Sequence, residues 1–202
     1  FAGTESALSE RNPLVNETVL SGDLGVAGNR NDNAYHIITI TDPLSKIRVD
    51  GFRIRFGNAD GTGNEANGAA IWIENTAPII ANCRFEDNTA TGDGGAIAVA
   101  GTAAPFIQQS TFINNSSTAN GGAIGLLGGG YRLVQSTFIN NRALNGAAIV
   151  MGAGSYANLT FQGNQATEKG GAIWLQGGAV LLANVAFVGN RAQEGGGFFG
   201  QG

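Results

Sequence analysis

The densest group of acidic side chains in the repetitive part of the chain is the pair Glu86 and Asp87, with Asp93 a few residues further on. Grouped carboxylates can hold Ca²⁺ against a uronate, and an arginine such as Arg84 or Arg55 could then act as the base. Adjacent residues of a strand point to opposite faces, however, and the next repeat has no carboxylate at the matching positions. The sequence therefore favours a solvated corner over a catalytic or metal site.

Two polar segments have the composition of calcium-binding loops. One spans residues 60–65 (Asp-Gly-Thr-Gly-Asn-Glu), and the other spans residues 29–33 and includes Asp32. The first lacks the alternating acidic pattern of an EF-hand loop, and it lengthens its repeat, which indicates a protruding loop. We expect both segments to be loops without an ion, with structural Ca²⁺ as the alternative.

Four isolated residues could contribute other chemistry. His36 lies in an apolar β run, without the Ser, Cys or Asp partners that would make it a general base. Cys83 takes the place of a serine in the next two repeats, which predicts a small inward core residue. Trp72 and Trp174 share one outward register position, where aromatic rings could stack on sugars. The sequence thus identifies no catalytic residue, no cofactor-binding residue and no metal ligand.

The composition excludes several classes of protein. The 202 residues include 33 glycines without a Gly-X-Y period, which excludes collagen, and 43% apolar residues argue against disorder. The net charge is −4 and no basic stripe is present, so binding to nucleic acid is disfavoured. A single cysteine excludes an intrachain disulfide. No run approaches the ~18 apolar residues that a membrane-spanning helix needs.

One two-part sequence motif recurs six times along the chain. Its first half is Phe-x-x-Asn, loosened to Phe56 and Asn58 in the first copy, and its second half is Gly-Gly-Ala-Ile or a variant of it. The first anchors step by 23–29 residues and are Phe56, Phe85, Phe112, Phe138, Phe161 and Phe187. The second anchors are Ile71, Ile97, Ile124, Ile149, Ile173 and Phe198. A period in the mid-twenties that holds over six copies predicts a solenoid.

Each repeat divides into three short strands separated by turns. Three strands in a coil of about 25 residues predict an all-β fold, a parallel β-helix with coils stacked roughly 4.8 Å apart. Like side chains then meet along the axis, so we expect a phenylalanine column, an isoleucine column and buried alanines. The asparagines three residues after each phenylalanine should occupy left-handed corners and bond as a ladder. A second ladder is predicted at Asn82, Gln109, Gln135, Asn158 and Asn184.

The chain before the repeats is less regular. We divide the chain into residues 1–45, an irregular N-terminal segment with the first coil or coils, and residues 46–202, one continuous array of β-helix repeats. The β-branched and alternating stretches predict short strands at 19–20, 35–40, 47–50 and 52–56. We expect the whole to be part of a longer chain.

The paired signals Phe-x-x-Asn and Gly-Gly-Ala-Ile resemble the repeats of the polymorphic outer membrane proteins, bacterial surface proteins built on a β-helical passenger. The opening, from Phe1–Glu5 through Leu20–Asp23 to Asn31–Tyr35, looks like the start of large secreted right-handed β-helix proteins of environmental bacteria. These resemblances imply a right-handed solenoid of pectate-lyase-like architecture and a secreted or cell-surface location in bacteria. They imply little about activity, because the same coil carries adhesins, lyases and structural fibres.

We therefore expect a non-catalytic structural or adhesive protein of a bacterial cell surface or matrix, without a cofactor. The alternative is a polysaccharide lyase or hydrolase, or a carbohydrate-binding module, on the same fold. Residues 195–199 (Gly-Gly-Gly-Phe-Phe) read as an unfinished coil, and an open β-helix end exposes backbone donors and acceptors. We expect such ends to support a homo-oligomer or fibre. A surface receptor or a glycan is the other expected partner.

Overall fold

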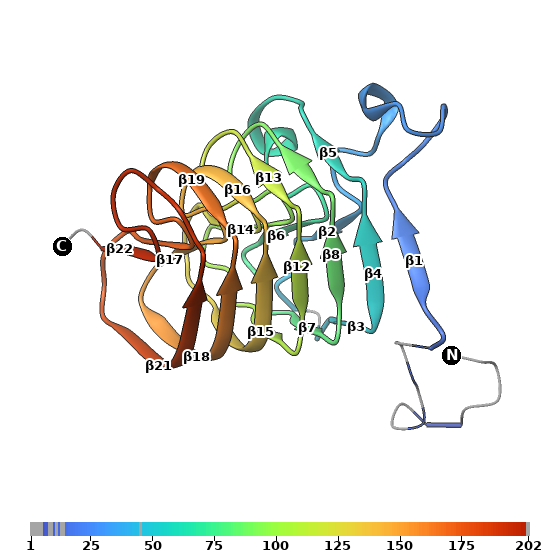
Figure 1. Cartoon of the computed structure of the whole chain (residues 1–202). Helices are drawn as coiled ribbons and strands as arrows, with labels where there is room; N and C mark the ends of the chain where they lie inside the picture. The colour runs from blue at the N-terminus through green and yellow to red at the C-terminus, as the bar shows by residue number, and fades with distance from the viewer. Residues whose placement is uncertain (1–5, 8–9, 11, 13–14, 45, 201–202) are drawn as a thin grey trace.

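The computed structural model describes residues 6–7, 10, 12, 15–44 and 46–200. From Thr18 onward the described chain winds around one axis as a stack of parallel strands (Figure 1). The coils follow one another from the N-terminal end, drawn in blue, to the C-terminal end, drawn in red. Residues at equal positions of successive repeats face each other, as Phe112 faces both Phe85 and Phe138. The predicted parallel β-helix with three short strands per coil is therefore confirmed.

Three parallel sheets form the sides of the stack. Sheet A contains β1 (Thr18–Ser21), β3 (Arg48–Asp50), β4 (Phe52–Arg55), β7 (Ile79–Ala81), β8 (Arg84–Glu86), β11 (Phe106–Gln108), β12 (Thr111–Ile113), β15 (Arg132–Ile139), β18 (Gly154–Gln162) and β21 (Val180–Val188). Sheet B contains β2 (Ile38–Ile40), β6 (Ile71–Glu74), β10 (Ile97–Ala100), β14 (Ile124–Leu126), β17 (Ile149–Met151), β20 (Ile173–Leu175) and β22 (Phe198–Gly200). Sheet C contains β5 (Asn58–Ala59), β9 (Thr89–Ala90), β13 (Ser116–Ser117), β16 (Arg142–Asn145) and β19 (Gln165–Lys169). The 3₁₀ helices η2 (Arg30–Asp32) and η3 (Gly63–Ala66) lie in the loops of the described chain.

The glycine pairs before sheet B make its corner. The glycine that opens each corner has a positive φ, which glycine adopts without steric cost, at Gly68, Gly94, Gly121, Gly146, Gly170 and Gly195. The second glycine at 95, 122 and 171 approaches the next coil so closely that a side chain would collide with it, whereas alanine takes this place at 69 and 147. At Gly122, an added Cβ would lie 2.2 Å from the carbonyl oxygen of Ala147.

Two columns of apolar side chains fill the core. The phenylalanine rings stack face to face with centroids 4.7–5.4 Å apart, in the order Phe85, Phe112, Phe138, Phe161 and Phe187. The isoleucine column is in register and fully buried at Ile71, Ile97, Ile124, Ile149 and Ile173. The alanine before each isoleucine is also buried. Each of these predicted columns is confirmed.

A buried ladder of asparagines connects the coils at the corner between sheets A and C. The backbone N–H and the side-chain Nδ2 of Asn115 both donate to Oδ1 of Asn141, at 3.0 and 3.1 Å. The same pattern runs through Asn88, Asn115, Asn141, Asn164 and Asn190. The predicted ladder is confirmed, but its left-handed backbone is not. The positive φ belongs to the preceding residue, such as Asn114 (φ 54°), because that residue makes the turn and leaves the asparagine pointing inward.

The second predicted ladder is mostly absent. Its five positions do have positive φ, so they form the corner within sheet A. Among the described residues, only Asn184 and Asn158 bond to each other, at 2.7 Å, while Asn82 donates instead to Asp50. These side chains point outward, where other polar groups compete for them.

The first copy of the repeat is shifted by two residues from the predicted alignment. Ile54 pairs with Phe85 and takes the place in the apolar column that the sequence assigned to Phe56. Phe56 has φ 64° and packs its ring against the guanidinium of Arg55, 3.8 Å from the ring centroid. Gly57, not Asn58, stands at the ladder position and donates its N–H to Asn88. The alignment was wrong because isoleucine and phenylalanine serve equally well as inward apolar residues.

The N-terminal segment already contributes strands to the stack. β1 pairs with β4, and β2 pairs with β6, as expected for strands at 19–20 and within 35–40. β3 and β4 confirm the other two predicted strands. The opening residues 1–5 lie outside the described residues, and the division at 45/46 stays a prediction. In the described part of the chain, no helix is long and apolar enough to cross a membrane.

Candidate binding groove

Glu86 is buried, not solvated. Its side chain is on the outer face of β8, opposite Phe85, yet the residue is only 4% exposed. Nε of Arg53 lies 2.5 Å from one carboxylate oxygen, and Arg84 pairs with the other. The predicted solvated corner is therefore wrong at this residue, because two guanidinium groups take the place of water. Both carboxylate oxygens are engaged by these ion pairs.

The remaining members of this acidic group lie at different corners of the coil. Asp87 occupies the left-handed corner after β8, with φ 53°. Asp93 lies in the turn before β10, where its Oδ1 accepts hydrogen bonds from N and Nδ2 of Asn120, both at 3.0 Å. Burial raises the pKa of Asp93 above its ordinary value, and the hydrogen bonds from Asn120 oppose that rise. The group therefore does not converge on one point.

The two polar loops are held by their own hydrogen bonds. The loop at 29–33 contains η2, and Oδ2 of Asp32 accepts the backbone N–H of Val26 at 2.9 Å. The loop at 60–65 is mostly exposed and contains the start of η3. Among the described residues, no three His, Cys, Asp or Glu side chains are placed to hold a metal ion together. The expectation of two loops without an ion, with structural Ca²⁺ as the alternative, stays a prediction.

His36 and Trp72 pack against each other on the outer face of sheet B. Their ring centroids are 6.0 Å apart, and Nδ1 of His36 lies 3.2 Å from the carbonyl oxygen of Gly68. Burial lowers the pKa of His36, and the Gly68 carbonyl opposes that shift. Trp72 is only 4% exposed, so the predicted exposed position is wrong there, because His36 covers the ring. Trp174 is half-buried, and the two indoles form no common exposed face.

Cys83 is an inward core residue, as predicted. It is buried, and its N–H donates to Oγ of Ser110 at 3.3 Å. Its Sγ lies 3.1 Å from the carbonyl oxygen of Ala81, a contact that Ser110 repeats with Gln108 in the next coil. Burial raises the pKa of the thiol. The residue therefore serves packing within the coil.

A groove runs along the outer face of sheet C, parallel to the axis of the stack. Its larger part is a hollow of about 620 Å³. One wall consists of Arg142, Gln165 and Arg191, which face one another on successive coils. The other wall lies two residues further along each coil and consists of Thr118, Leu144, Thr167 and Gln193. Small side chains form the floor, including the buried Ala143 and Ala166. We call this feature the sheet C groove.

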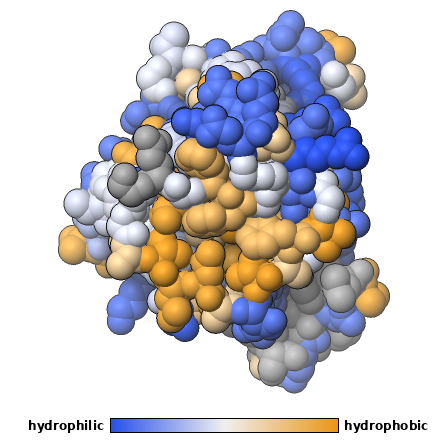
Figure 2. All heavy atoms as spheres, turned by 60° about the vertical axis from the view of Figure 1, so that its left-hand side comes forward, coloured by the Kyte–Doolittle hydropathy of each residue, from blue (hydrophilic) through white to orange (hydrophobic). Residues whose placement is uncertain are grey.

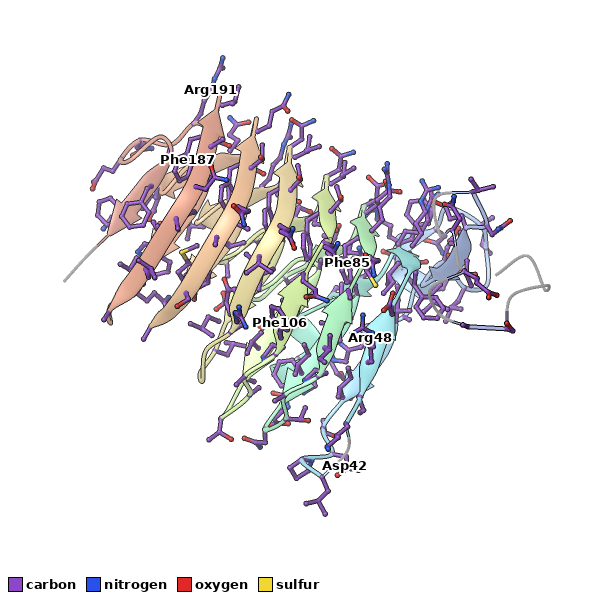
Figure 3. All side chains as sticks on the ribbon, turned by 90° about the horizontal axis from the view of Figure 1, so that it is seen from below. Asp42, Arg48, Phe85, Phe106, Phe187 and Arg191 are labelled. Atoms are coloured by element: carbon purple, nitrogen blue, oxygen red, sulfur yellow. The ribbon has the colours of Figure 1, made fainter. Side chains whose placement is uncertain are left out.

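A second hollow of about 570 Å³ extends the groove toward the N-terminal coils and shares Arg142 with the first. Asp87, Asn114 and Asn140 line it from the left-handed corner beside the ladder, and Ser116, which faces Arg142, continues the arginine wall. Figure 3 shows Arg191 projecting outward from the C-terminal end of the stack. The groove therefore spans several coils and is open to solvent.

This coil geometry agrees with a known family. The family model described as "right handed beta helix region" matches residues 26–192, most of the chain. The chain belongs to the right-handed β-helix family. The family is broader than the polymorphic outer membrane proteins, so it confirms the predicted β-helix and leaves the narrower resemblance a prediction. Comparison with curated proteins and with solved structures finds no match.

The groove of this right-handed β-helix has the chemistry of a binding surface. Its guanidinium groups can form paired hydrogen bonds with anions, and its amides and hydroxyls can bond to polar ligands. Asp87 is the one carboxylate among the described lining residues. Glycoside hydrolysis typically uses two carboxylates about 5–10 Å apart, and the lining does not supply such a pair.

The residues that line this groove were not identified from the sequence. Arg142, Gln165 and Arg191 each follow directly after an asparagine of the buried ladder. At the position after the ladder asparagine, the sequence has arginine in two repeats that are two coils apart, and this is the signal that could identify the groove. The pattern was missed because this position varies in residue type, whereas the inward positions repeat.

Proposed function

We propose that this right-handed β-helix is a non-catalytic structural and adhesive segment of a bacterial cell surface or extracellular matrix. The observation that carries this proposal is the unbroken bonding between coils. The asparagine ladder and the stacked phenylalanines each connect five successive coils, so bending the stack would break buried contacts. A rod of this kind holds its outward side chains at a fixed spacing, which suits a scaffold that presents a binding surface.

The distribution of carboxylates supports a non-catalytic role. The sheet C groove has one carboxylate in its described lining, and both oxygens of Glu86 are engaged by arginines. Enzymes of the rival class, a polysaccharide lyase or hydrolase on this fold, need acidic groups that are free to act on the substrate or to hold an ion. We propose that the chain functions without a cofactor.

The resemblance of the repeats to those of the polymorphic outer membrane proteins supports the proposed location. Those proteins are bacterial surface proteins, and the opening of this chain also resembles secreted β-helix proteins. A secreted or surface-exposed bacterial location is therefore our proposal. The partner would be a receptor or a glycan that meets the rod along its side.

We also propose a second mode of contact, between copies of the chain, at the edge of the last described coil. Among the described strands, β21 and β22 each pair on one side only. Figure 2 shows apolar side chains gathered on the face that includes this end. Phe187 is 40% exposed although it continues the stacked column, and Phe198, which pairs with the inward Ile173, is also exposed. We propose that an open end of this kind can add a further coil from another copy, as edge strands do.

An assay for turnover tests the non-catalytic role. The chain would be incubated with polygalacturonate and alginate, with and without Ca²⁺, and unsaturated products and new reducing ends would be measured. We expect no release above that of the buffer. Clear turnover would establish the rival enzyme class and overturn the proposal.

The assembly is tested by sedimentation of two matched variants over a wide concentration range. Phe187→Lys places a charge on the inward side of the open edge, where it should block pairing. Leu181→Lys places the same charge on the outward side of the same strand and serves as the control. We expect concentration-dependent oligomers for the unaltered chain and for Leu181→Lys, and monomers for Phe187→Lys. Monomers of the unaltered chain throughout would overturn end-to-end assembly.

A further inference from the structure

We propose that the sheet C groove binds an extended acidic polysaccharide in which charged sugars alternate with neutral ones. This inference rests on the proposed adhesive function and specifies the ligand of one surface. It is carried by the charge of the groove, by the spacing of its arginines and by the composition of its second wall.

The charge of the groove is opposite to that of the whole chain, since its described lining has two arginines and one carboxylate, Asp87. The chain has a net charge of −4, yet two of the residues on one groove wall are Arg142 and Arg191. Among the described residues, neither arginine forms an ion pair, whereas Arg53 and Arg84 are paired with glutamate. An arginine without an acidic partner can offer its full set of donors to a carboxylate or sulfate in a bidentate arrangement.

The two arginines are separated by one neutral residue along the axis. Arg142 faces Gln165, and Gln165 faces Arg191, so the charges lie two coils apart. With neighbouring strands about 4.8 Å apart, two coils correspond to about 10 Å. An extended polysaccharide advances by about one pyranose ring per coil. A chain that lies along the groove would therefore present every second sugar to an arginine and the sugar between them to Gln165.

The second wall and the N-terminal extension fit the uncharged parts of such a chain. Thr118, Thr167 and Gln193 offer hydroxyl and amide groups that can bond to sugar hydroxyls. Asn114 and Asn140 continue this set of amides. The described lining contains no aromatic ring, and single-stranded nucleic acids are typically held by base stacking on aromatic side chains. These features favour a polysaccharide over a nucleic acid.

Binding to defined polymers tests the proposal. Calorimetry on the full chain would compare hyaluronan oligosaccharides, which alternate acidic and neutral sugars, with polygalacturonate, a neutral cellulose oligosaccharide and single-stranded DNA of similar length. We expect hyaluronan to bind most tightly and the affinity to fall with rising salt. Equal or tighter binding of polygalacturonate would refute the alternation. Equal binding of DNA would refute the polysaccharide specificity, and no binding of hyaluronan would refute the proposal as a whole.

Three matched arginine variants locate the site. Arg142→Ala and Arg191→Ala should each weaken hyaluronan binding about tenfold or more, because each removes a charge-assisted contact. Arg132→Ala serves as the control, since Arg132 is exposed on sheet A and packs on Phe106 outside the groove. An equal loss in the control, or no loss in the groove variants, would overturn the assignment. Because none of the three residues is buried, circular dichroism should show the same fold in each.

The outcome also separates this inference from the proposed function. Binding without cleavage of the hyaluronan supports both. The absence of binding refutes the ligand assignment and leaves the structural role standing. Cleavage of the bound chain refutes the non-catalytic role while the groove keeps its ligand.

Discussion

The asparagine ladder can be tested at its middle by the substitution Asn115→Ala. The side chain of Asn115 makes four hydrogen bonds in a fully buried position. Its Oδ1 accepts from the backbone N–H and from Nδ2 of Asn88, at 3.2 and 3.0 Å. Its Nδ2 donates to the carbonyl oxygen of Phe85 and to Oδ1 of Asn141, at 3.0 and 3.1 Å. Alanine removes all four.

The expected cost follows from the groups that lose their partner. Without Asn115, the backbone N–H of Asn88 has no acceptor, and its Nδ2 keeps only the bond to the carbonyl of Ile54. Water cannot readily reach either donor, because Asn88 is fully buried. An unsatisfied buried group costs about 1–3 kcal/mol, so these two donors should cost about 2–6 kcal/mol together. That is a large fraction of the ~5–15 kcal/mol that stabilises a typical domain.

Asn190→Ala provides the matched control at the C-terminal end of the same ladder. Asn190 accepts the same pair of bonds from Asn164, but it is only partly buried. The donors left behind belong to Asn164, which is as fully buried as Asn88, but the space vacated by the partly exposed Asn190 is open to solvent. Water can enter that space and accept from Asn164, so the cost should be near 1 kcal/mol. Urea unfolding followed by circular dichroism would measure both values, with the slope checked for a change in cooperativity. If the two substitutions cost the same, or if Asn115→Ala costs under ~1 kcal/mol, the ladder does not hold the coils together as we argue.

Two further substitutions test a partly buried carboxylate and a buried thiol. Asp93→Asn should stabilise the chain at pH 7 by about 1 kcal/mol, since the new Nδ2 can donate to Asn67 as Asn120 donates to Asp93. Burial raises the pKa of Asp93, so the protonated Asp93 contributes stability below the ordinary value of 3.8, and this contribution is lost as the pH rises through the folded-state pKa. The stability that Asp93→Asn gains over the native chain, measured by urea unfolding, should therefore shrink toward pH 3.5. Cys83→Ser should change the unfolding free energy by about 1 kcal/mol or less, since serine takes this place in the next coil, and the native thiol should react far more slowly with a thiol reagent than in urea. A gain that does not depend on pH, or a thiol that reacts equally fast in the folded chain, would contradict these assignments.

The inward half of each coil was predictable because stacking repeats it. Residues such as Phe112 and Ile124 meet like residues above and below, so the same letter returns at each coil and its period can be counted. The alignment of the first repeat was wrong because the residue type changes there while the packing stays the same. Ile54 fills the place of a phenylalanine, and the sequence pattern points instead to Phe56, two residues later.

The outward half was much harder to predict, because its contacts cross between coils. The burial of Glu86 depends on Arg53, 33 residues away, and the burial of Trp72 depends on His36 in the loop that covers it. Neither relation has a period or a local sequence signal. The sheet C groove is of the same kind, since its wall is a column of residues that differ from coil to coil.

The ladder and the groove are nevertheless coupled by position. Arg142 follows directly after Asn141, whose side chain is fixed by bonds to two coils, so the ladder sets the height and direction of each groove residue. The inward residue can therefore stay constant while the outward neighbour varies, and a new ligand specificity requires no change in the core. Arg142 pairs with Ser116, the residue directly after Asn115. The substitution Asn115→Ala should therefore weaken hyaluronan binding even in chains that remain folded. Unchanged binding in a folded but destabilised Asn115→Ala variant would show that the groove keeps its spacing without the ladder.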